Sequence, residues 1–208
     1  MLTLYYAPDT CALASHIALE HAEADYRLVR IDFASKQQRS AEYLRVNPKG
    51  RVPALVTERG VLTETPAILQ FIAQQYPAAG LAPLDDPFEL ARMNAFHSYL
   101  CSTLHVAHAH RMRGYRWCDD PAAIVAMQKK VPQSVGECFE LIENEFFVGP
   151  WAMGAHYGVS DMYLFTLAQW MEADGVDPRR FPKVAAHRDR VRADPVVSRV
   201  IAAEHAPP

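Results

Sequence analysis

Cys11 is the side chain whose type and position point most directly to chemistry. It follows the apolar run Leu2–Tyr6 and stands in the first turn of a predicted helix, where backbone N–H groups and the helix dipole favour a thiolate. Ligands of α/β proteins bind outside the carboxyl ends of strands, where this junction lies. Asp9 opposes a thiolate unless its carboxylate turns away or caps the helix. A small buried hydrophobe is the alternative, and position alone leaves the two interpretations balanced.

Val52 and Pro53 form the second candidate feature. The proline enters a predicted strand after the turn signal Asn47-Pro-Lys-Gly50, a place where a cis peptide bond can be selected. A cis bond would turn the N–H and C=O of Val52 outward, toward an extended peptide-like ligand. An ordinary proline at a sheet edge is the alternative, and the sequence by itself favours it.

Glu64, Thr65 and Pro66 form the third feature. Thr65 is predicted to cap a helix whose first residue is Pro66, and a capped helix start binds carboxylates. The Glu64 carboxylate beside it would hold an ammonium group, so the pair would fit the two charges of an α-amino acid. A helix cap with no binding role is the commoner meaning of one Thr-Pro pair.

Four histidines on one long predicted helix raise the question of a metal site: His97, His105, His108 and His110. Two of them, three residues apart, are neighbours on the helix surface. No carboxylate or cysteine at matched spacing completes a ligand set, so we expect no metal. A hydrated face between domains with one functional histidine is the favoured interpretation. The four cysteines are scattered, which predicts neither a zinc knuckle nor a disulfide framework.

The elements that must position these residues fall into two groups. Residues 1–77 alternate strands and helices in the order β-α-β-α-β-β-α, which predicts a small α/β domain with one parallel crossover pair. The predicted ranges are 2–6, 11–21, 26–32, 41–46, 52–57, 60–62 and 66–75. Residues 78–87 are rich in proline, alanine and aspartate and are predicted to form a linker.

Residues 88–208 show helical periodicity only, which predicts an all-helical second domain. The predicted helices are 88–114, 121–147, 160–174, 182–193 and 195–204. Pro132 is expected to kink or split the second of them, because proline removes one helical hydrogen bond. The first of them carries more apolar residues than one face of a monomer needs, among them Phe96 and Leu100, which predicts a two-fold homodimer.

Composition excludes several classes of protein. The chain has 208 residues, of which 50% are hydrophobic and 22% charged, so a disordered or collagen-like chain is excluded. The formal net charge of -3 argues against a nucleic-acid partner, which would require a basic face. No apolar run approaches the ~18 residues that span a bilayer, and no basic residue precedes the first apolar stretch as in a signal peptide. We therefore expect a cytoplasmic protein with no nucleic-acid or membrane partner.

Three segments of the first domain together resemble a bacterial beta-class glutathione S-transferase. They are Leu4-Tyr-Tyr-Ala-Pro-Asp-Thr-Cys-Ala-Leu-Ala-Ser-His-Ile-Ala-Leu19, Asn47-Pro-Lys-Gly-Arg-Val-Pro-Ala-Leu55 and Leu62-Thr-Glu-Thr-Pro-Ala-Ile68. Shorter segments extend the likeness along the chain: Gly80-Leu-Ala-Pro83, Ser102-Thr-Leu-His105 and Asp161-Met-Tyr-Leu-Phe-Thr166. Each motif alone is weak, but their shared order over 208 residues is a specific signal.

The resemblance implies a thioredoxin-like N-terminal domain, an all-helical C-terminal domain, a homodimer, and glutathione as co-substrate with no prosthetic group. Cys11 matches a cysteine that lies beside the glutathione sulfur and forms a mixed disulfide with it. Val52, before a cis Pro53, matches the residue whose backbone pairs with the cysteinyl part. Glu64 and Thr65 match the residues that hold the γ-glutamyl end.

Three further positions match the family's site by the same resemblance: His105 and Tyr5 near the thiol, and Lys36 near the glycyl carboxylate. The chain also departs from the family's pattern. Asp9 replaces a small residue before the cysteine, and Val106 stands where several relatives carry a lysine. Gly158 replaces the hydroxyl residue of a reciprocal capping box, which weakens that helix start.

The leading hypothesis is a glutathione transferase that conjugates glutathione to small hydrophobic electrophiles in an apolar pocket between the domains. Glutathione-dependent reduction of disulfides or peroxides through Cys11 is a further activity of this hypothesis. A glutathione-dependent isomerase ranks lower, because such an enzyme is expected to carry a serine-rich turn before the first helix, where this chain has Asp9-Thr-Cys11. The alternative is a non-catalytic glutathione-binding or regulatory protein of the same fold.

Overall fold

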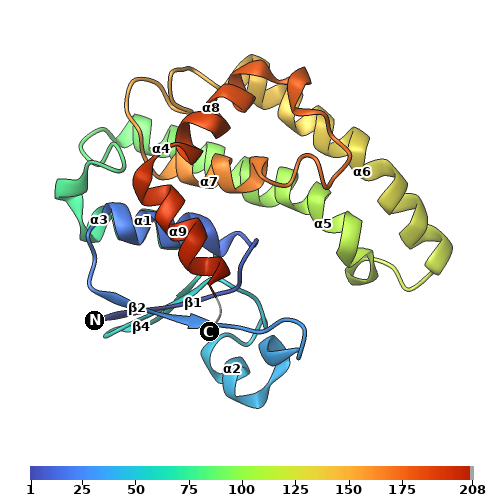
Figure 1. Ribbon diagram of the computed structural model, residues 1–208, viewed down its shortest axis with the longest axis horizontal. Helices are drawn as coiled ribbons and strands as arrows, with labels where there is room; N and C mark the ends of the chain where they lie inside the picture. The colour runs from blue at the N-terminus through green and yellow to red at the C-terminus, as the bar shows by residue number, and fades with distance from the viewer. Residues whose placement is uncertain (207–208) are drawn as a thin grey trace. The chain divides into compact units, whose positions relative to one another are not determined.

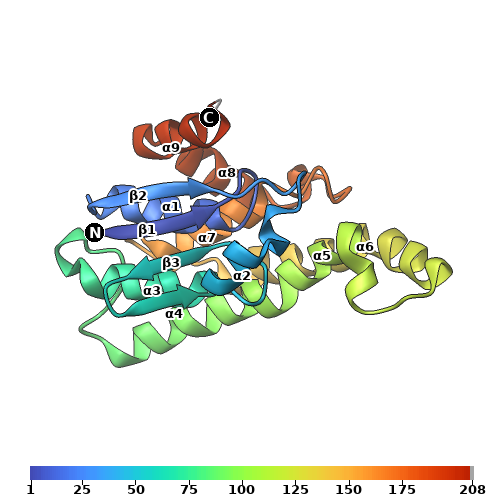
Figure 2. The same ribbon diagram turned by 90° about the horizontal axis from the view of Figure 1, so that it is seen from below.

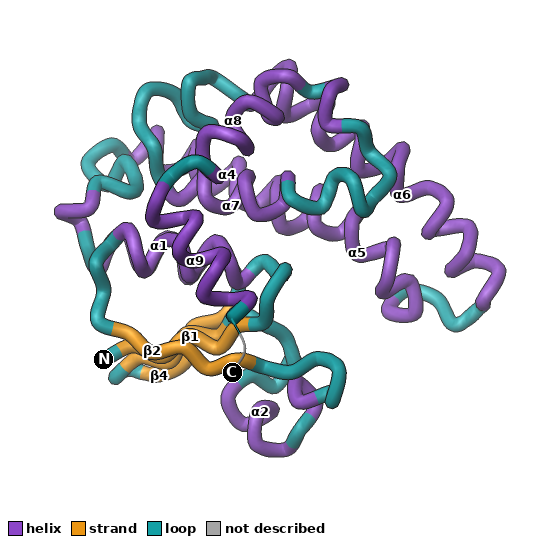
Figure 3. The backbone as a smooth tube through the Cα atoms, in the orientation of Figure 1, coloured by secondary structure: helices purple, strands orange, loops and turns teal. Residues whose placement is uncertain are grey.

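A computed structural model describes residues 1–206 of the chain. Two compact units form: the first contains Met1–Leu90 and the segment that starts at Arg192, and the second contains Ala91–Val191. Figure 3 shows that the strands belong to the first unit and that helices make up most of the second. The predicted domain boundaries stay a prediction, but packing places the last helix with the first unit.

The first unit is built on a mixed four-stranded sheet in the order β2-β1-β3-β4 (Figure 2). Its strands are β1 (Leu2–Tyr6), β2 (Tyr26–Arg30), β3 (Ala54–Thr57) and β4 (Gly60–Thr63). β1 and β2 pair in parallel, whereas β3 is antiparallel to both β1 and β4. The order of elements and the single parallel pair confirm the predicted thioredoxin-like domain.

Helices cover one face of this sheet and bury apolar side chains against it. The helices of the first unit are α1 (Ala12–His21), α2 (Ala41–Val46), α3 (Thr65–Gln75) and α9 (Pro195–His205). α1 and α3 pack together on one face of the sheet (Figures 1 and 2). Ile17 of α1 and Ile68 of α3 are fully buried, as is Leu4 of β1, so these side chains form the core beneath the helices.

α9 lies alongside α1 in Figure 1 and is fixed there by both apolar and polar contacts. Asp194 caps its start, and its carboxylate accepts a hydrogen bond from the backbone N–H of Val196 at 2.7 Å. Near the other end, the Glu204 carboxylate contacts Nδ1 of His16 in α1 at 2.9 Å, and both side chains are buried. A buried pair of this kind holds two helices in one register, because either group alone would be costly to bury.

The second unit contains only helices and loops apart from one isolated bridge, within its described residues. Its helices are α4 (Pro87–Tyr99, which begins in the first unit), α5 (His105–Arg113), α6 (Pro121–Leu141), α7 (Val159–Ala168) and α8 (Pro182–Arg192). A wide π-helical turn at Leu100–Leu104 joins α4 to α5, and a second at Ile142–Phe146 extends α6. Because of these turns, the chain stays helical over most of the predicted ranges 88–114 and 121–147.

Two helical predictions need correction. Pro132 does not split α6, which is one unbroken helix. Gly175 leaves room beside the proline ring, since a β-carbon there would lie 3.1 Å from Pro132 Cγ. α7 ends at Ala168 rather than at residue 174, because the following residues form turns that close at Gly175 with a φ of 76°.

α7 is the centre of the second unit, and every one of its residues is buried. The Asp161 carboxylate accepts hydrogen bonds from the N–H groups of Gly158 (2.8 Å) and Ala152 (2.7 Å) and contacts Nε2 of His187 at 2.8 Å. Gly158 has no side chain to return the bond, so half of the reciprocal capping box is absent, as predicted.

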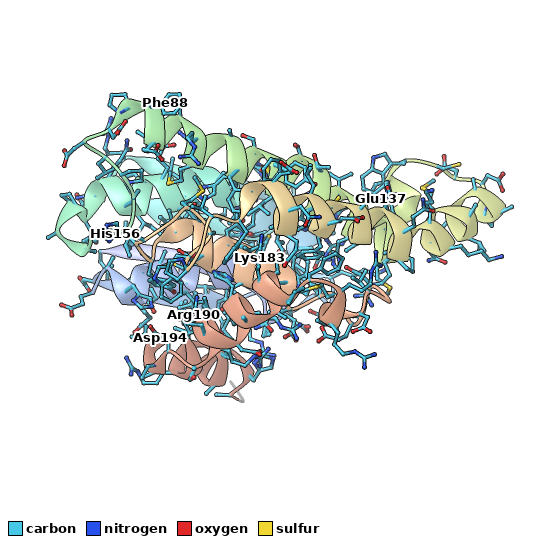
Figure 4. All side chains as sticks on the ribbon, turned by 90° about the horizontal axis from the view of Figure 1, so that it is seen from above. Phe88, Glu137, His156, Lys183, Arg190 and Asp194 are labelled. Atoms are coloured by element: carbon cyan, nitrogen blue, oxygen red, sulfur yellow. The ribbon has the colours of Figure 1, made fainter. Side chains whose placement is uncertain are left out.

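α8 is attached to the end of α6 by a side chain rather than by its own cap. The Glu143 carboxylate accepts the backbone N–H groups of Lys183 (2.9 Å) and Val184 (3.0 Å), and Lys183 Nζ donates to the Glu143 carbonyl at 2.8 Å. Figure 4 labels Lys183 near the start of α8 and Arg190 near its end, where Arg190 donates to the Pro150 carbonyl. None of the helices within residues 1–206 combines the length and apolar character that crossing a membrane needs.

The apolar residues that suggested a dimer are already covered within one chain. Phe96 is 6% exposed and Leu100 is fully buried, so both belong to the helical core. The homodimer therefore stays a prediction that these two residues no longer support.

Candidate functional site

Cys11 lies at the junction between β1 and α1. The structure begins α1 at Ala12, one residue later than predicted, so Cys11 is the residue that flanks the helix start. The preceding turn is fixed by Thr10, whose hydroxyl donates to the Ala7 carbonyl at 2.7 Å and accepts from Ala12 N–H at 3.3 Å. The half-buried thiol therefore sits at the positive end of a helix.

The Cys11 thiol contacts the backbone of the second candidate feature. Its Sγ donates to the carbonyl of Val52 at 3.6 Å, and the Val52–Pro53 peptide bond is cis. The sequence by itself favoured an ordinary proline here, so that interpretation is wrong and the bond implied by the family resemblance is confirmed. A thiol and a backbone carbonyl at the end of β1 and the start of β3 thus form one contiguous surface.

The loop before Pro53 is held in place by two side chains. Tyr43 Oη and Asn47 Nδ2 each donate to the Arg51 carbonyl at 2.7 Å. Gly50 has a φ of 60°, and a β-carbon there would lie 2.8 Å from the Gln38 carbonyl oxygen, so only glycine fits. The turn signal Asn47-Pro-Lys-Gly50 is therefore the support on which the Val52 backbone rests.

Glu64, not Thr65, is the cap residue of α3. Its φ of 73° and ψ of 121° are unusual for a residue with a side chain, and its carbonyl accepts the first helical hydrogen bond from Ile68 N–H at 3.0 Å. Thr65 is the first helical residue and is 4% exposed, and Pro66 follows it. The predicted helix start was wrong by one residue because this backbone geometry has no signature in residue type.

Glu64 has a partner that the sequence analysis did not identify. Lys49 Nζ lies 2.5 Å from a Glu64 carboxylate oxygen and 2.6 Å from the hydroxyl of Thr63. Both charged side chains are substantially exposed, at 42% for the lysine and 63% for the glutamate. The carboxylate at the start of α3 is therefore accessible and already binds an ammonium group.

The other two candidates of the first unit lie in different settings. Tyr5 is half-buried in β1, with its ring 5.5 Å from that of Tyr43. Lys36 is exposed in the loop between β2 and α2, with a φ of 60°. Its predicted role at the glycyl carboxylate stays a prediction.

Asp9, the residue expected to oppose a Cys11 thiolate, pairs with a histidine of α9. Its carboxylate lies 3.1 Å from Nε2 of His205, whose Nδ1 contacts the Ile201 carbonyl at 2.9 Å. The hydrogen bond to Ile201 is the main factor that raises the pKa of His205, and the charge of Asp9 adds to it. The partners are 196 residues apart in the sequence, so no local pattern could have predicted this pair.

His105 belongs to the second unit, where it begins α5 directly after the first π-helical turn. Its ring centre lies 5.2 Å from that of Trp170 and 6.1 Å from that of His108. His108 in turn contacts the buried Asp174 through Nδ1, at 2.7 Å. His105 is thus part of a network of ring contacts in its own unit, and its role beside the glutathione sulfur stays a prediction.

The histidines do not assemble a metal site within residues 1–206, where no group of three metal-binding side chains is found. His97 is fully buried, and its Nε2 contacts the Ser160 hydroxyl at 2.9 Å. Burial lowers its pKa to about 4, so this histidine is neutral at physiological pH. It is a core residue rather than part of a hydrated face.

The helical unit holds a cavity of about 230 Å³, but none of the predicted site residues lines it. Its walls come from α4, the second π-helical turn and the loop that follows: Arg92, Ala95, Phe96, Tyr99, Glu145, Phe146 and Met153. This cavity therefore lends no support to the predicted electrophile pocket.

Taken together, the first unit offers three groups that can hold a small peptide. A thiol stands at one helix start, a backbone carbonyl precedes a cis proline, and a carboxylate stands at a second helix start. Such a set can bind an extended ligand that carries a thiol, peptide groups and an ammonium group.

Comparison with known proteins gives consistent results. Residues 1–74 match the family model described as glutathione S-transferase, N-terminal domain. The glutathione S-transferase GstA of Escherichia coli O157:H7 is 30% identical over 205 residues, which cover 98% of each chain.

Solved structures extend the match over nearly all of the chain. A glutathione transferase homologue from Sulfitobacter with bound glutathione has a TM-score of 0.95 and 40% identity, covering 99% of each chain. A beta-class glutathione S-transferase from Sphingomonas chungbukensis has a TM-score of 0.85 and 31% identity, covering 98% of each.

Proposed function

Because the chain belongs to the glutathione S-transferase family, we propose that it conjugates glutathione to small hydrophobic electrophiles, with glutathione as co-substrate. The observation that carries this proposal is the contact between the Cys11 thiol and the Val52 carbonyl at the start of α1. That contact puts the Cys11 thiol beside the backbone of the residue before cis Pro53. Once the thiol loses its proton, the N–H groups at the start of α1 favour the thiolate.

Glutathione lies across the first unit in this proposal. Its γ-glutamyl ammonium group replaces Lys49 on the Glu64 carboxylate, and its α-carboxylate binds at the start of α3 beside Thr65. Its cysteinyl peptide groups pair with the backbone of Val52 before cis Pro53. The exposed carboxylate of Glu64, which already holds a cation, supports this placement.

The remaining candidates complete the site. The glutathione sulfur lies beside Cys11, with Tyr5 and His105 near it, and Lys36 binds the glycyl carboxylate. In conjugation, the glutathione thiolate forms a carbon–sulfur bond to the electrophile, and the leaving group departs with the electron pair of the broken bond. Helical N–H groups and the dipole of α1 favour the charged thiolate that this attack needs.

Cys11 supports a second activity, the reduction of disulfides. Its thiolate attacks one sulfur of a glutathione-containing disulfide, which forms a mixed disulfide at Cys11 and releases the other sulfur as a thiolate. A second glutathione then attacks the mixed disulfide, which restores Cys11 and produces oxidised glutathione. The complete cycle converts the glutathione-containing disulfide and one glutathione thiol into the free substrate thiol and oxidised glutathione, so one disulfide bond is broken for each one formed.

Retention on glutathione-agarose together with turnover of chlorodinitrobenzene tests the transferase proposal. We expect both, because the site holds glutathione and activates its thiol. Retention without turnover of several electrophiles would favour the alternative, a non-catalytic binding protein of the same fold.

A Cys11→Ala variant tests the reductase activity separately. We expect intact protein exposed to oxidised glutathione to gain one adduct at Cys11 and the variant to lose that adduct and most reductase activity. Conjugation should persist in part, because backbone N–H groups still hold the substrate thiol. Cys118→Ala is the matched control, since this half-buried thiol lies in the second unit. An adduct that disappears in the control instead would assign the chemistry to Cys118.

We further propose that the protein is a cytoplasmic homodimer, as the family resemblance implies. Phe88 on α4 is 71% exposed, which is consistent with a surface that a second copy covers. Light scattering at micromolar concentration should give about twice the chain mass of 23.4 kDa, whereas a value equal to the chain mass would reject the dimer.

A further inference from the structure

We propose that His205 is a positioning residue for the Cys11 thiol, because it holds and neutralises Asp9, the carboxylate two residues before the cysteine. The inference rests on the proposed role of Cys11 and adds a residue that the resemblance does not assign. Its evidence is a set of contacts that all lie within the first unit.

The turn that carries Asp9 keeps its backbone close to that of Cys11. Two residues apart, their α-carbons are separated by at most about 7 Å. Asp9 has a φ of 59°, a conformation that aspartate tolerates better than most residues, and its side chain is 79% exposed. The hydrogen bonds of Thr10 to the residues on both sides fix the turn in this shape.

Both ring nitrogens of His205 face acceptors. Nε2 lies 3.1 Å from the Asp9 carboxylate, and Nδ1 lies 2.9 Å from the carbonyl oxygen of Ile201. A carbonyl oxygen and a carboxylate can only accept, so both bonds form only when the ring carries both protons. The raised pKa of His205 has the same two contacts among its causes.

The end of α9 is anchored, so His205 is not a mobile surface group. Glu204, the preceding residue, is buried against His16 of α1, and Arg30 of β2 donates to the Ala206 carbonyl at 3.3 Å. The charged groups around His205 are therefore Asp9, Glu204 and Arg30, and the charge of Glu204 is already engaged by His16. α1 begins directly after Cys11 and carries His16, which holds Glu204 of α9. The same helix therefore positions the Cys11 thiol and the end of α9 that carries His205.

The consequence is an electrostatic balance at the start of α1. With His205 protonated, Asp9 contributes little net charge, and the helix N–H groups determine the state of the thiol. Without His205, the Asp9 carboxylate is uncompensated and disfavours a thiolate nearby. The effect must vanish when Asp9 is neutral, and that dependence distinguishes positioning from a direct role.

The test measures alkylation of Cys11 by iodoacetamide as a function of pH, with the modified peptide quantified by mass spectrometry. We expect His205→Gln to slow alkylation at pH 7 by about two- to fivefold, the range that an exposed ion pair supplies. The pH midpoint of the reaction should rise correspondingly. Asp9→Asn should react at least as fast as the unmodified protein, and the double variant should match Asp9→Asn.

His21→Gln is the matched control, because His21 pairs with Asp194 at 3.7 Å and also joins α1 to the α9 segment. We expect it to leave Cys11 alkylation unchanged. An unchanged alkylation rate in His205→Gln would overturn the inference. So would a double variant that is slower than Asp9→Asn by the same factor as His205→Gln is slower than the unmodified protein. The readout needs neither glutathione binding nor turnover, so a failure of the proposed function would be seen separately, in the retention and turnover assays.

Discussion

Two carboxylates of the first unit, Asp9 and Glu64, can be compared with two of the second, Asp161 and Asp174. The first pair are exposed, stand on backbone with φ of 59° and 73°, and each binds one cation at the surface. The second pair are at most 3% exposed, and each contacts a buried or half-buried histidine. Similar residue types are thus accessible to a ligand in one unit and buried in internal contacts in the other.

Backbone conformation shows the same division. Every residue other than glycine with positive φ, among those described, lies in the first unit: Asp9, Glu23, Lys36 and Glu64. Within residues 91–191, only glycines adopt such a conformation. Three of these four residues, all but Glu23, belong to or adjoin the proposed site, whereas the buried pairs Asp161–His187 and Asp174–His108 lie in the second unit. The comparison predicts that single changes in the second unit affect stability most, whereas those in the first affect binding.

The largest effect is expected at Asp161. Asp161→Ala leaves two backbone N–H groups and His187 without their buried acceptor, which should cost about 3–5 kcal/mol of unfolding free energy. Urea denaturation measures the loss. Asp120→Ala removes an exposed helix cap in the same unit and should cost only about 1 kcal/mol. Equal losses in the two variants would show that burial of the carboxylate does not matter.

The next effect is a pH dependence caused by His97. The folded state keeps the pKa of His97 at about 4, whereas an unfolded histidine titrates at about 6.5. Between these values the unfolded chain binds a proton that the folded chain refuses. This part of the stability is complete above the unfolded pKa and is lost as pH falls toward 4, a total of about 3 kcal/mol.

A His97→Gln variant isolates that contribution. It should flatten the fall in unfolding free energy between pH 6.5 and 4, because glutamine does not titrate. His156→Gln, at the exposed histidine labelled in Figure 4, should leave the profile unchanged. If the profile of His97→Gln keeps its full slope, the acid sensitivity arises elsewhere.

A smaller effect is expected at Glu64, where stability and binding should change in opposite directions. Glu64→Gly relieves the backbone strain and should stabilise the protein by about 1 kcal/mol. It should also weaken glutathione binding about tenfold, which corresponds to roughly 1.4 kcal/mol, because the ammonium group loses its partner. Glu64→Ala should show the weaker binding without the gain in stability. Calorimetry measures glutathione affinity and thermal denaturation measures stability. If Glu64→Gly is no more stable than Glu64→Ala, the backbone at residue 64 is not strained.

The smallest effect concerns the lysine that occupies Glu64. Lys49→Met should change the unfolding free energy by less than about 1 kcal/mol, since the pair is exposed. Glutathione affinity should stay the same or rise, because the carboxylate no longer has an internal cation. Lys36→Met, at the other lysine of residues 1–90, should instead lower affinity through loss of the glycyl carboxylate contact. Reversed effects in the two variants would exchange the roles of the lysines.

Much of the fold was predictable because its signals are local. β1 and α2 match their predicted ranges to the residue, since apolar runs and Pro or Gly turn signals mark their ends. The starts of α1 and α3 were each misplaced by one residue, because the backbone angles of the cap residue, and not its type, decide where the first helical bond forms. The end of α7 was predicted at residue 174 because Gly175 follows it, but that glycine ends the turns of residues 169–175, and the helix itself ends at Ala168.

The candidate site was predictable in part for the same reason. Local sequence made Cys11 and Val52 candidates, although it favoured an ordinary Pro53, and the cis bond was implied only by the family resemblance. The contact between Cys11 and Val52 joins the end of β1 to the start of β3. The partners of the two exposed carboxylates were missed, because His205 is far away in the sequence and Lys49 was assigned only to a turn. Tertiary packing, rather than residue pattern, selects which cation meets which carboxylate.

The position of α9 has a consequence for how the chain acquires its structure. Glu204, which closes the buried pair with His16, is synthesised 188 residues after its partner. An emerging chain therefore completes the contiguous segment Ala91–Val191 before the first unit has its final helix. Until then, His16 and the part of α1 that α9 covers lack their partners, so the first unit stays incomplete until the last helix is made.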